Sequence, residues 1–363
     1  MKNLKKAGII FLSLTTAVLL GCMISGPAPE EKAASVPVVS EKVLIPGGRS
    51  IGVRMDVKGV LVVGLEEIKT TDGKTVNPGL ISGLEIGDTI LEINGKKVDQ
   101  AKEVQDRINE LQGTVELKVK RRDRILTLEL TPVISASDGL YKLGLWIKDR
   151  TAGIGTLTFY DPDSGIFGAL GHGITDAETG TVLKVKSGEL LDSKVESVKE
   201  GKAGTPGEIR GIFYEAESPL GRLKSNTKYG IFGSAYEDIS CPLYEKPLVA
   251  ATRDQIKEGP AFILTTIEGD TVEKFEIEIE KLTPQSTPDT KSMILRVTDE
   301  RLLKRTGGIV QGMSGSPIIQ NKKLVGAVTH VFVNEPDRGY AIFAERMIEM
   351  QDAVLNDKNE SAA

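Results

Sequence analysis

Short apolar runs separated by turn residues make up most of the chain, and this texture restricts the fold more than any other feature. Between Leu140 and Glu345, runs such as "GIGTLTFY", "KYGIFGSAY" and "KSMILRVTD" alternate with glycine, aspartate and proline. Many short strands at such spacing predict a mainly β fold, a sandwich or a barrel, over residues 140–350. The segment "YAIFAERMIEMQDAVL" predicts a closing helix, and residues 351–363 read as a flexible tail.

The N-terminus has a different character. "MKNLKK" precedes an uncharged apolar run over residues 7–24, the pattern of an export signal or a membrane anchor, which we assign to residues 1–24. Lys2, Lys5 and Lys6 directly precede this run, which argues against the alternative that it is a helix buried in a protein core. "LLGC" ends at Cys22 and resembles a lipoprotein cleavage box, although Leu20 is not the usual small residue there. Residues 25–42 are rich in Pro, Ala, Ser and Glu and predict a linker that is open to proteolysis.

Charge and cysteine content exclude several classes of function. The formal net charge is −5, and no run of more than three consecutive basic residues follows the N-terminus, so we expect no nucleic-acid binding. The chain has only two cysteines. If Cys22 is lipidated or removed with the signal, Cys241 has no partner, and we expect no intramolecular disulfide. The same scarcity excludes the usual Cys/His zinc sites, and we expect neither metal nor cofactor.

Residues 43–133 contain a second recognisable pattern. "GLEIGDTILEING" is followed by residues 101–112, a predicted helix with Val104, Ile108 and Leu111 on one face, and then by alternating strands. This block resembles a PDZ domain. The resemblance places the loop that holds a peptide carboxylate at "PGGRSIGVRM". It implies a groove between residues 51–55 and the helix, with Ile51, Gly52 and Val53 pairing with an extended peptide ligand. A β-rich packing domain without a ligand is the alternative.

Two histidines are the only imidazoles in the chain. His172 lies in "GALGHGITD", where flanking glycines leave room for a nucleophile on one side of the ring and an acid on the other. His330 lies in "GAVTHVFV", within a predicted strand. For His330 we weigh core packing against a role in contacting a substrate side chain from a specificity pocket.

The segment "GGIVQGMSGSP" carries the pattern Gly-x-Ser-Gly-x-Pro around Ser314, the layout of a trypsin-type nucleophile loop. Backbone N–H groups of Gly312, Met313 and Ser314 could converge there on a developing oxyanion. The pattern differs from the strand-to-helix nucleophile elbow, because Ser316 occupies the place of the second glycine and a strand follows. An ordinary turn is the alternative to a catalytic loop.

The residues alone leave the acidic partner of the histidine open. Asp176 lies four residues from His172 and is a fair candidate, whereas Asp161 and Asp163 lie on a predicted turn. Asp299 follows the strand "SMILRV", and its alternative role is to cap the helix predicted for "ERLLKR".

Taken together, these motifs resemble the SpoIVB peptidase family, the stage IV sporulation serine proteases of endospore-forming bacteria. The resemblance covers nearly the whole chain and rests on "GALGHGITD", "RVTDERLLKRTGGIVQGMSGSPIIQ" and "GAVTHVFVNEPDRGYAIF". It implies a chymotrypsin-like β-barrel domain over residues 140–350, with His172 as base, Asp299 as acid and Ser314 as nucleophile. In chymotrypsin-like enzymes, however, the acid usually comes well before the nucleophile loop.

The resemblance also implies an exported, membrane-tethered serine endopeptidase in the space between the forespore and mother-cell membranes. Its expected substrates are the extracytoplasmic part of a sporulation membrane protein, whose cleavage leads to activation of a late sigma factor, and its own linker at residues 25–42. Met313 stands where trypsin-type zymogens carry an Asp, so activation by a new N-terminal amine is not available. The alternatives are a quality-control protease of the HtrA type, in which the PDZ domain follows the protease, and a non-enzymatic PDZ lipoprotein.

Overall fold

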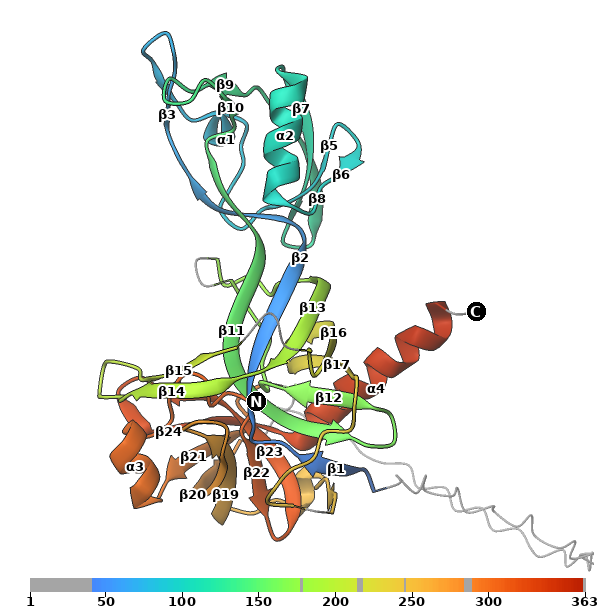
Figure 1. Ribbon diagram of the computed structural model, residues 1–363, viewed down its shortest axis with the longest axis vertical. Helices are drawn as coiled ribbons and strands as arrows, with labels where there is room; N and C mark the ends of the chain where they lie inside the picture. The colour runs from blue at the N-terminus through green and yellow to red at the C-terminus, as the bar shows by residue number, and fades with distance from the viewer. Residues whose placement is uncertain (1–40, 177–178, 214–217, 245, 284–288, 362–363) are drawn as a thin grey trace, which may run out of the picture. The chain divides into compact units, whose positions relative to one another are not determined.

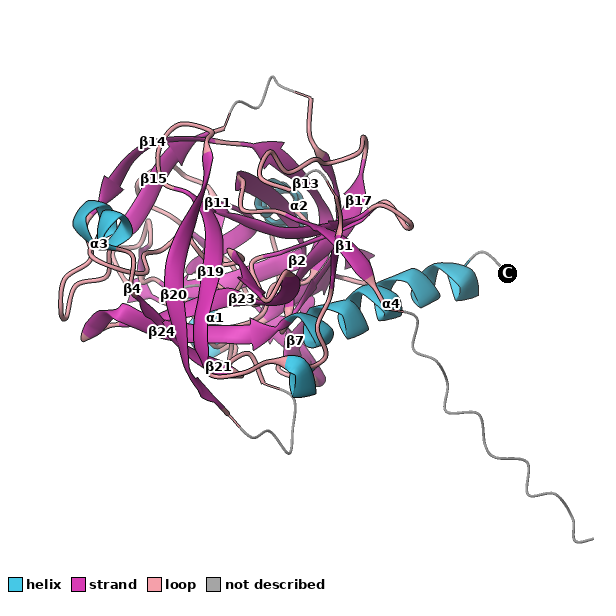
Figure 2. Ribbon diagram, turned by 90° about the horizontal axis from the view of Figure 1, so that it is seen from below, coloured by secondary structure: helices cyan, strands magenta, loops and turns pink. Residues whose placement is uncertain are grey.

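The computed structural model describes residues 41–176, 179–213, 218–244, 246–283 and 289–361. The predicted signal or anchor, Cys22 and nearly all of the predicted linker therefore lie outside the described residues. Strands dominate the described chain (Figure 2), which confirms the prediction of a mainly β fold. In the described residues, no helix is both long enough and apolar enough to cross a bilayer. Cys241 is a free, buried thiol.

The first of two strand rings contains both early and late parts of the chain. Antiparallel pairing runs in the order β2–β11–β12–β17–β16–β13 and returns from β13 to β2, which closes the ring. Its interior is packed with apolar side chains such as Leu157, Phe167 and Ile231. The strands are β2 (Ser50–Leu65), β11 (Leu145–Asp161), β12 (Ile166–Ala169), β13 (Val185–Asp192), β16 (Gly221–Thr227) and β17 (Gly230–Ala235), with β1 (Val43–Pro46) and β18 (Leu248–Val249) added beside β11.

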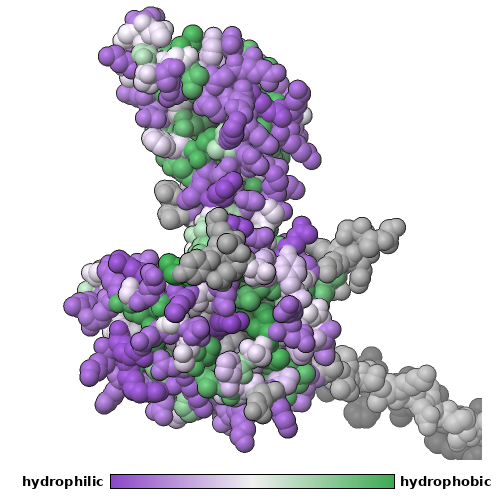
Figure 3. Space-filling model, in the orientation of Figure 1, coloured by the Kyte–Doolittle hydropathy of each residue, from purple (hydrophilic) through white to green (hydrophobic). Residues whose placement is uncertain are grey.

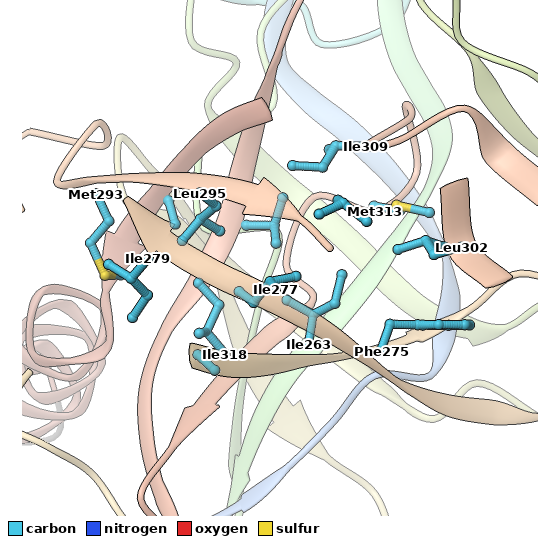
Figure 4. Close-up of a cluster of buried hydrophobic side chains, with 14 of the residues drawn as sticks. Ile263, Phe275, Ile277, Ile279, Met293, Leu295, Leu302, Ile309, Met313 and Ile318 are labelled. Carbon is cyan, nitrogen blue, oxygen red and sulfur yellow. The ribbon is translucent and has the colours of Figure 1, made fainter. Parts of the chain in front are cut away.

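The second ring is a closed six-stranded barrel formed by the C-terminal part of the chain. Its strands are β19 (Gly259–Thr266), β20 (Val272–Leu282), β21 (Met293–Val297), β22 (Pro317–Gln320), β23 (Lys323–Phe332) and β24 (Glu335–Phe343). Figure 4 shows its apolar interior, to which Phe275, Leu295 and Met313 contribute. The helix α3 (Glu300–Thr306) follows β21, and α4 (Ala344–Ser361) follows β24. The predicted tail over 351–363 is therefore wrong as far as Ser361, because α4 continues through it.

A third unit is inserted between β2 and β11. Those two strands run side by side beyond the first ring (Figure 1), with Asp56 opposite Arg150 and Leu65 opposite Leu145. The intervening chain forms its own apolar core around Val60, Ile90 and Ile108, and we call residues 58–149 the inserted domain. On the face drawn in Figure 3, hydrophilic residues cover most of it. Its elements are β3 (Ile68–Lys69), β4 (Thr75–Val76), α1 (Pro78–Ile81), β5 (Thr89–Ile93), β6 (Lys96–Lys97), α2 (Ala101–Leu111), β7 (Val115–Arg121), β8 (Arg124–Leu130), β9 (Val133–Ile134) and β10 (Tyr141–Lys142).

The predicted start of the PDZ block at residue 43 is wrong. Ile51 and Val53 are buried in the first ring, where β2 pairs with β11 along one edge and with β13 along the other. Gly52 lies between them, and a Cβ there would come within 2.5 Å of Phe213. With both edges paired, these residues cannot accept an added peptide strand.

Three further elements complete the fold, namely β14 (Lys194–Lys199), β15 (Glu208–Ile212) and the 3-10 turn Arg253–Gln255.

Candidate active site

A cavity of about 460 Å³ lies between the two rings. The first ring lines it with Val53 of β2 and residues 151–154 of β11, and the second lines it with residues 329–331 of β23. His172, Ser314 and His330 all border this cavity. The structure thus brings together the predicted base, the predicted nucleophile and the second histidine, although 142 positions separate His172 from Ser314 in the sequence.

The loop that carries Ser314 needs glycine at two positions. Gly312 and Gly315 have φ values of +99° and +97°, which side-chain-bearing residues rarely adopt. A Cβ at Gly315 would lie 2.1 Å from the carbonyl oxygen of Thr156. Thr156 fastens the loop to β11, because its Oγ1 donates to Gly312 O at 2.8 Å and its N–H donates to Ser314 O at 3.0 Å. The nucleophile loop of the second ring is therefore positioned by the first.

Two of the three predicted oxyanion donors remain suitable. The N–H of Met313 donates to Val310 O at 3.1 Å, and the Met313 side chain is fully buried in the barrel core (Figure 4). The prediction that Met313 N–H is an oxyanion donor is therefore wrong, because this N–H already has an acceptor. Within the described chain, the amides of Gly312 and Ser314 have no recorded acceptor. These two N–H groups can receive the charge of a tetrahedral intermediate.

The hydroxyl of Ser314 does not hydrogen-bond to an imidazole in this structure. It donates instead to the backbone carbonyl of Thr329 at 2.9 Å. Since a serine side chain has three staggered rotamers, a rotation about χ1 changes the partner of Oγ without moving the backbone. Such a rotation would be needed before the Ser314 hydroxyl could bond to an imidazole.

The loop that carries His172 has a strained start. Leu170 and Gly171 adopt φ values of +70° and +69°, and a branched residue in this region is a clear outlier. The imidazole Nδ1 lies 2.9 Å from the carbonyl oxygen of Gly173. A carbonyl only accepts, so Nδ1 carries the proton and the lone pair is left on Nε2. Burial lowers the pKa of His172, against a smaller opposite effect of the Gly173 carbonyl, and this favours the neutral ring, whose lone pair on Nε2 can accept a proton.

Asn226 on β16 holds the segment that follows the histidine, and sequence reasoning missed it. Its Oδ1 accepts from Ile174 N, and its Nδ2 donates to the carbonyl oxygens of Ile174 and Leu183, all at 2.8 Å. These bonds fix the backbone next to Gly173, whose carbonyl orients His172. No motif in "GRLKSNT" signals this role, because the contacts join segments 52 and 43 residues apart.

The structure does not bring Asp299 to the histidine. Asp299 is the N-cap of α3, where it accepts from Arg301 N at 2.9 Å, from the Arg301 guanidinium at 2.8 Å and from Glu276 N at 3.2 Å. The guanidinium of Arg301 is the main cause that lowers the pKa of Asp299, and burial opposes it. Asp299 does not line the cavity. Asp299 therefore caps α3, as the alternative predicts, and it does not make the contact with His172 that a catalytic acid needs.

The other candidate acids have partners away from the cavity. Asp176 is buried and binds Lys148, whereas Asp161 binds Lys42 at 2.7 Å and is also bonded to Gln351 of α4. Asp163 is exposed on the turn after β11. Within the described residues, the hydrogen bond recorded for the His172 ring is the one to the Gly173 carbonyl. The structure therefore orients His172 through the backbone, and Ser314 borders the same cavity without a hydrogen bond to it.

His330 lies beside the base rather than in the barrel core. The centroids of the His172 and His330 rings are 5.0 Å apart, and His330 is exposed at the cavity. Partial desolvation, followed by the charges of His172 and Lys291, lowers the pKa of His330 to about 4. His330 is therefore neutral near pH 7, as the prediction of a substrate-contacting imidazole requires.

A second groove lies in the inserted domain. It has a volume of about 250 Å³ and is bordered by α2 and by residues 141–147. Leu145 and Trp146 pair with β2 along one edge, and in the described chain no other strand pairs with them. The segment that borders the groove opposite α2 therefore lies within residues 141–147, and it is not residues 51–55 as predicted.

Comparison with known families settles the class of the protein. A family model for the SpoIVB peptidase S55 matches residues 139–348. The chain belongs to this SpoIVB peptidase family. It is accordingly a serine peptidase, as the sequence motifs predict.

Solved structures resemble separate parts of this SpoIVB-family peptidase. The PDZ domain of an SdrC-like protein from Listeria monocytogenes is 23% identical, with a match that covers 25% of this chain and 87% of that domain at a TM-score of 0.20. The active form of the Rv3671c protease from M. tuberculosis is 15% identical and covers 56% of this chain and 74% of its own, at a TM-score of 0.32. Its inactive form gives 14% identity and the same TM-score.

Proposed function

We propose that this serine peptidase is an extracytoplasmic endopeptidase of sporulation signalling. It cleaves a membrane-protein partner and its own linker at residues 25–42. The observation that carries the proposal is the meeting of Ser314 and His172 in one cavity of a chain that belongs to the SpoIVB peptidase family. The apolar lining by Ile154, Ile309 and Val331 favours an apolar substrate side chain beside the scissile bond.

The reaction follows from the geometry of the loop residues. Ser314 Oγ leaves the Thr329 carbonyl, gives its proton to Nε2 of His172 and attacks the peptide carbonyl carbon. The N–H groups of Gly312 and Ser314 stabilise the oxyanion. The Gly173 carbonyl accepts from Nδ1–H and so steadies the imidazolium, which then protonates the leaving amine. Water, deprotonated by His172, hydrolyses the acyl-enzyme and restores the serine.

The test compares the full-length protein with its Ser314→Ala variant. A fluorophosphonate probe should label the wild type at Ser314, and the variant should neither react nor cut its own linker. Mass spectrometry reports the label, the true N-terminus and any acyl chain on Cys22 together. Labelling that persists in the variant would show that another residue is the nucleophile.

The inserted domain has a separate role in this proposal as a peptide-binding PDZ domain. The unpaired edge of Leu145–Ile147 faces α2 across the groove, and such an edge can accept an extended peptide as an added strand. A quality-control protease of the HtrA type is the rival function. Digestion of unfolded casein at a rate similar to that of a specific partner would favour this rival.

A further inference from the structure

A cationic cleft of about 620 Å³ lies between the inserted domain and the first ring. Four basic side chains border it, namely Lys58 of β2, Lys120 of β7, Arg122 of the β7–β8 turn and Lys184 next to β13. None of the four forms an ion pair with any residue in the described part of the chain. Ile86, Ile125 and Val182 add apolar surface and are each about half exposed, at 53%, 52% and 43%.

The positive charge of the cleft is not cancelled by its own acidic residues. Glu85 and Asp88 both bind Arg121, at 2.5 Å and 2.7 Å, and Asp123 also attracts Lys184. Arg121 and the four other basic side chains still outnumber these three carboxylates, so the cleft keeps an excess of positive charge. The neighbouring ammonium of Lys120 lowers the pKa of Lys184. Two lysines held this close together repel each other, and an anionic group between them would relieve the repulsion.

Two elements that line the cleft also line the active-site cavity. Val53 of β2 lines the cavity and Val57 of the same strand lines the cleft, a separation of about 13 Å at the rise of a strand. Thr175 lines the cavity, and its bridge partner Val182 lines the cleft. An extended chain of about four to six residues can therefore reach from one to the other.

The linker of this chain has the matching pattern. Glu30 and Glu31 precede the apolar run Val36–Val39 by about five residues, which corresponds to about 17 Å when extended. The acidic pair outweighs the single Lys32 that follows it and suits the cationic cleft, and the apolar run suits the apolar active-site cavity. This combination of charge and spacing distinguishes the linker from a neutral peptide.

We propose that the cleft is a substrate-binding site for an acidic extended peptide, and that the linker, presented in trans, is one such peptide. Its glutamates lie against Lys58, Lys120, Arg122 and Lys184 while the valine run enters the cavity. This inference rests on the proposed function, since it assigns the substrate class of the same active site.

The experiment uses two synthetic peptides that span residues 25–42, the native one and one with Glu30→Gln and Glu31→Gln. The full-length wild type is expected to cleave the native peptide with a KM about five- to tenfold lower and an unchanged kcat. Lys120→Ala combined with Lys184→Ala should abolish this preference. Lys96→Ala combined with Lys97→Ala removes two exposed lysines of β6 and should retain it. Because exposed charges are screened, 0.5 M NaCl should reduce the preference.

Binding separates failure of this inference from failure of the proposed function. Fluorescence anisotropy with the full-length Ser314→Ala variant reports affinity even if no peptide is cut. Equal affinity for the two peptides, or a preference that survives loss of Lys120 and Lys184, overturns the inference. Lysine-dependent binding to phosphatidylglycerol vesicles with no preference for the acidic peptide overturns it in favour of a membrane contact.

Discussion

At the scale of single residues, the ring of His172 has a backbone carbonyl as its hydrogen-bond partner, and among the described residues no carboxylate bonds to it. His172 is oriented by the Gly173 carbonyl, and that carbonyl is held in turn by the clamp of Asn226 on Ile174. A neutral acceptor stabilises an imidazolium less than a carboxylate does, so in the proposed mechanism the two oxyanion donors must supply a larger share of the stabilisation. In this structure the Ser314 hydroxyl donates to Thr329 O, and the proposed mechanism requires it to turn toward His172.

The pH dependence of catalysis follows from the burial of His172. Burial lowers the pKa of His172 below its ordinary value of 6.5, and only the neutral ring can accept the serine proton. Protonation therefore begins only at a lower pH, and kcat/KM for a short peptide should stay high as the pH falls through 6.5. Its acid limb should have a midpoint below that value, as measured in steady-state assays between pH 4 and pH 8.

The matched control for this pH profile is His330→Gln, which removes the second imidazole. The acid limb should persist in this variant, because the group that titrates is His172. Loss of the limb would assign it to His330 instead, and a wild-type midpoint above 6.5 would contradict the effect of burial.

At the scale of elements, α3 depends on Asp299. The carboxylate caps the helix and also accepts from Glu276 N on β20, so Asp299→Ala removes a cap and leaves two amides unpaired. We expect the free energy of unfolding to fall by about 1–3 kcal/mol, with partial recovery in Asp299→Asn because the amide oxygen can still cap. Urea titration measures both changes. A large loss of fluorophosphonate labelling by Asp299→Asn, with stability unchanged, would return this residue to the role of acid.

Elements with a local pattern could be predicted from the sequence. Val104 and Ile108 share one face of the helix predicted over 101–112, and the structure has α2 at Ala101–Leu111 with both residues buried. The glycine-flanked His172 and the Gly-x-Ser-Gly loop can be picked out in the sequence because such loops have a fixed residue spacing, and the structure places both at one cavity. The contacts of Asn226 with Ile174 and of Thr156 with the Ser314 loop could not be predicted. Their partners are distant in the chain, and single polar residues such as these form no recognisable sequence motif.

At the scale of the whole molecule, one long strand explains why the domain boundary was misplaced. β2 spans 16 residues, and its first part belongs to the first ring while its last part belongs to the inserted domain. The pattern of apolar and polar residues along a strand shows that a face is buried, but it does not show which hydrophobic core that face belongs to. The pairing partner β11 follows about 80 residues later, and only that register reveals the insertion.

This arrangement predicts that the inserted domain folds without the two rings. The apolar residues of its core all lie between Val60 and Ile147, and its two ends are adjacent because Leu61 pairs with Lys148. A fragment of residues 58–149 should therefore unfold in one cooperative thermal transition and give dispersed amide resonances, since its core needs no other part of the chain. Val104→Asp places a charge in that core and should abolish the transition, whereas exposed Lys97→Asp should not. A fragment without a cooperative transition would mean that the rings supply part of its stability, and that β2 and β11 join one folding unit rather than two.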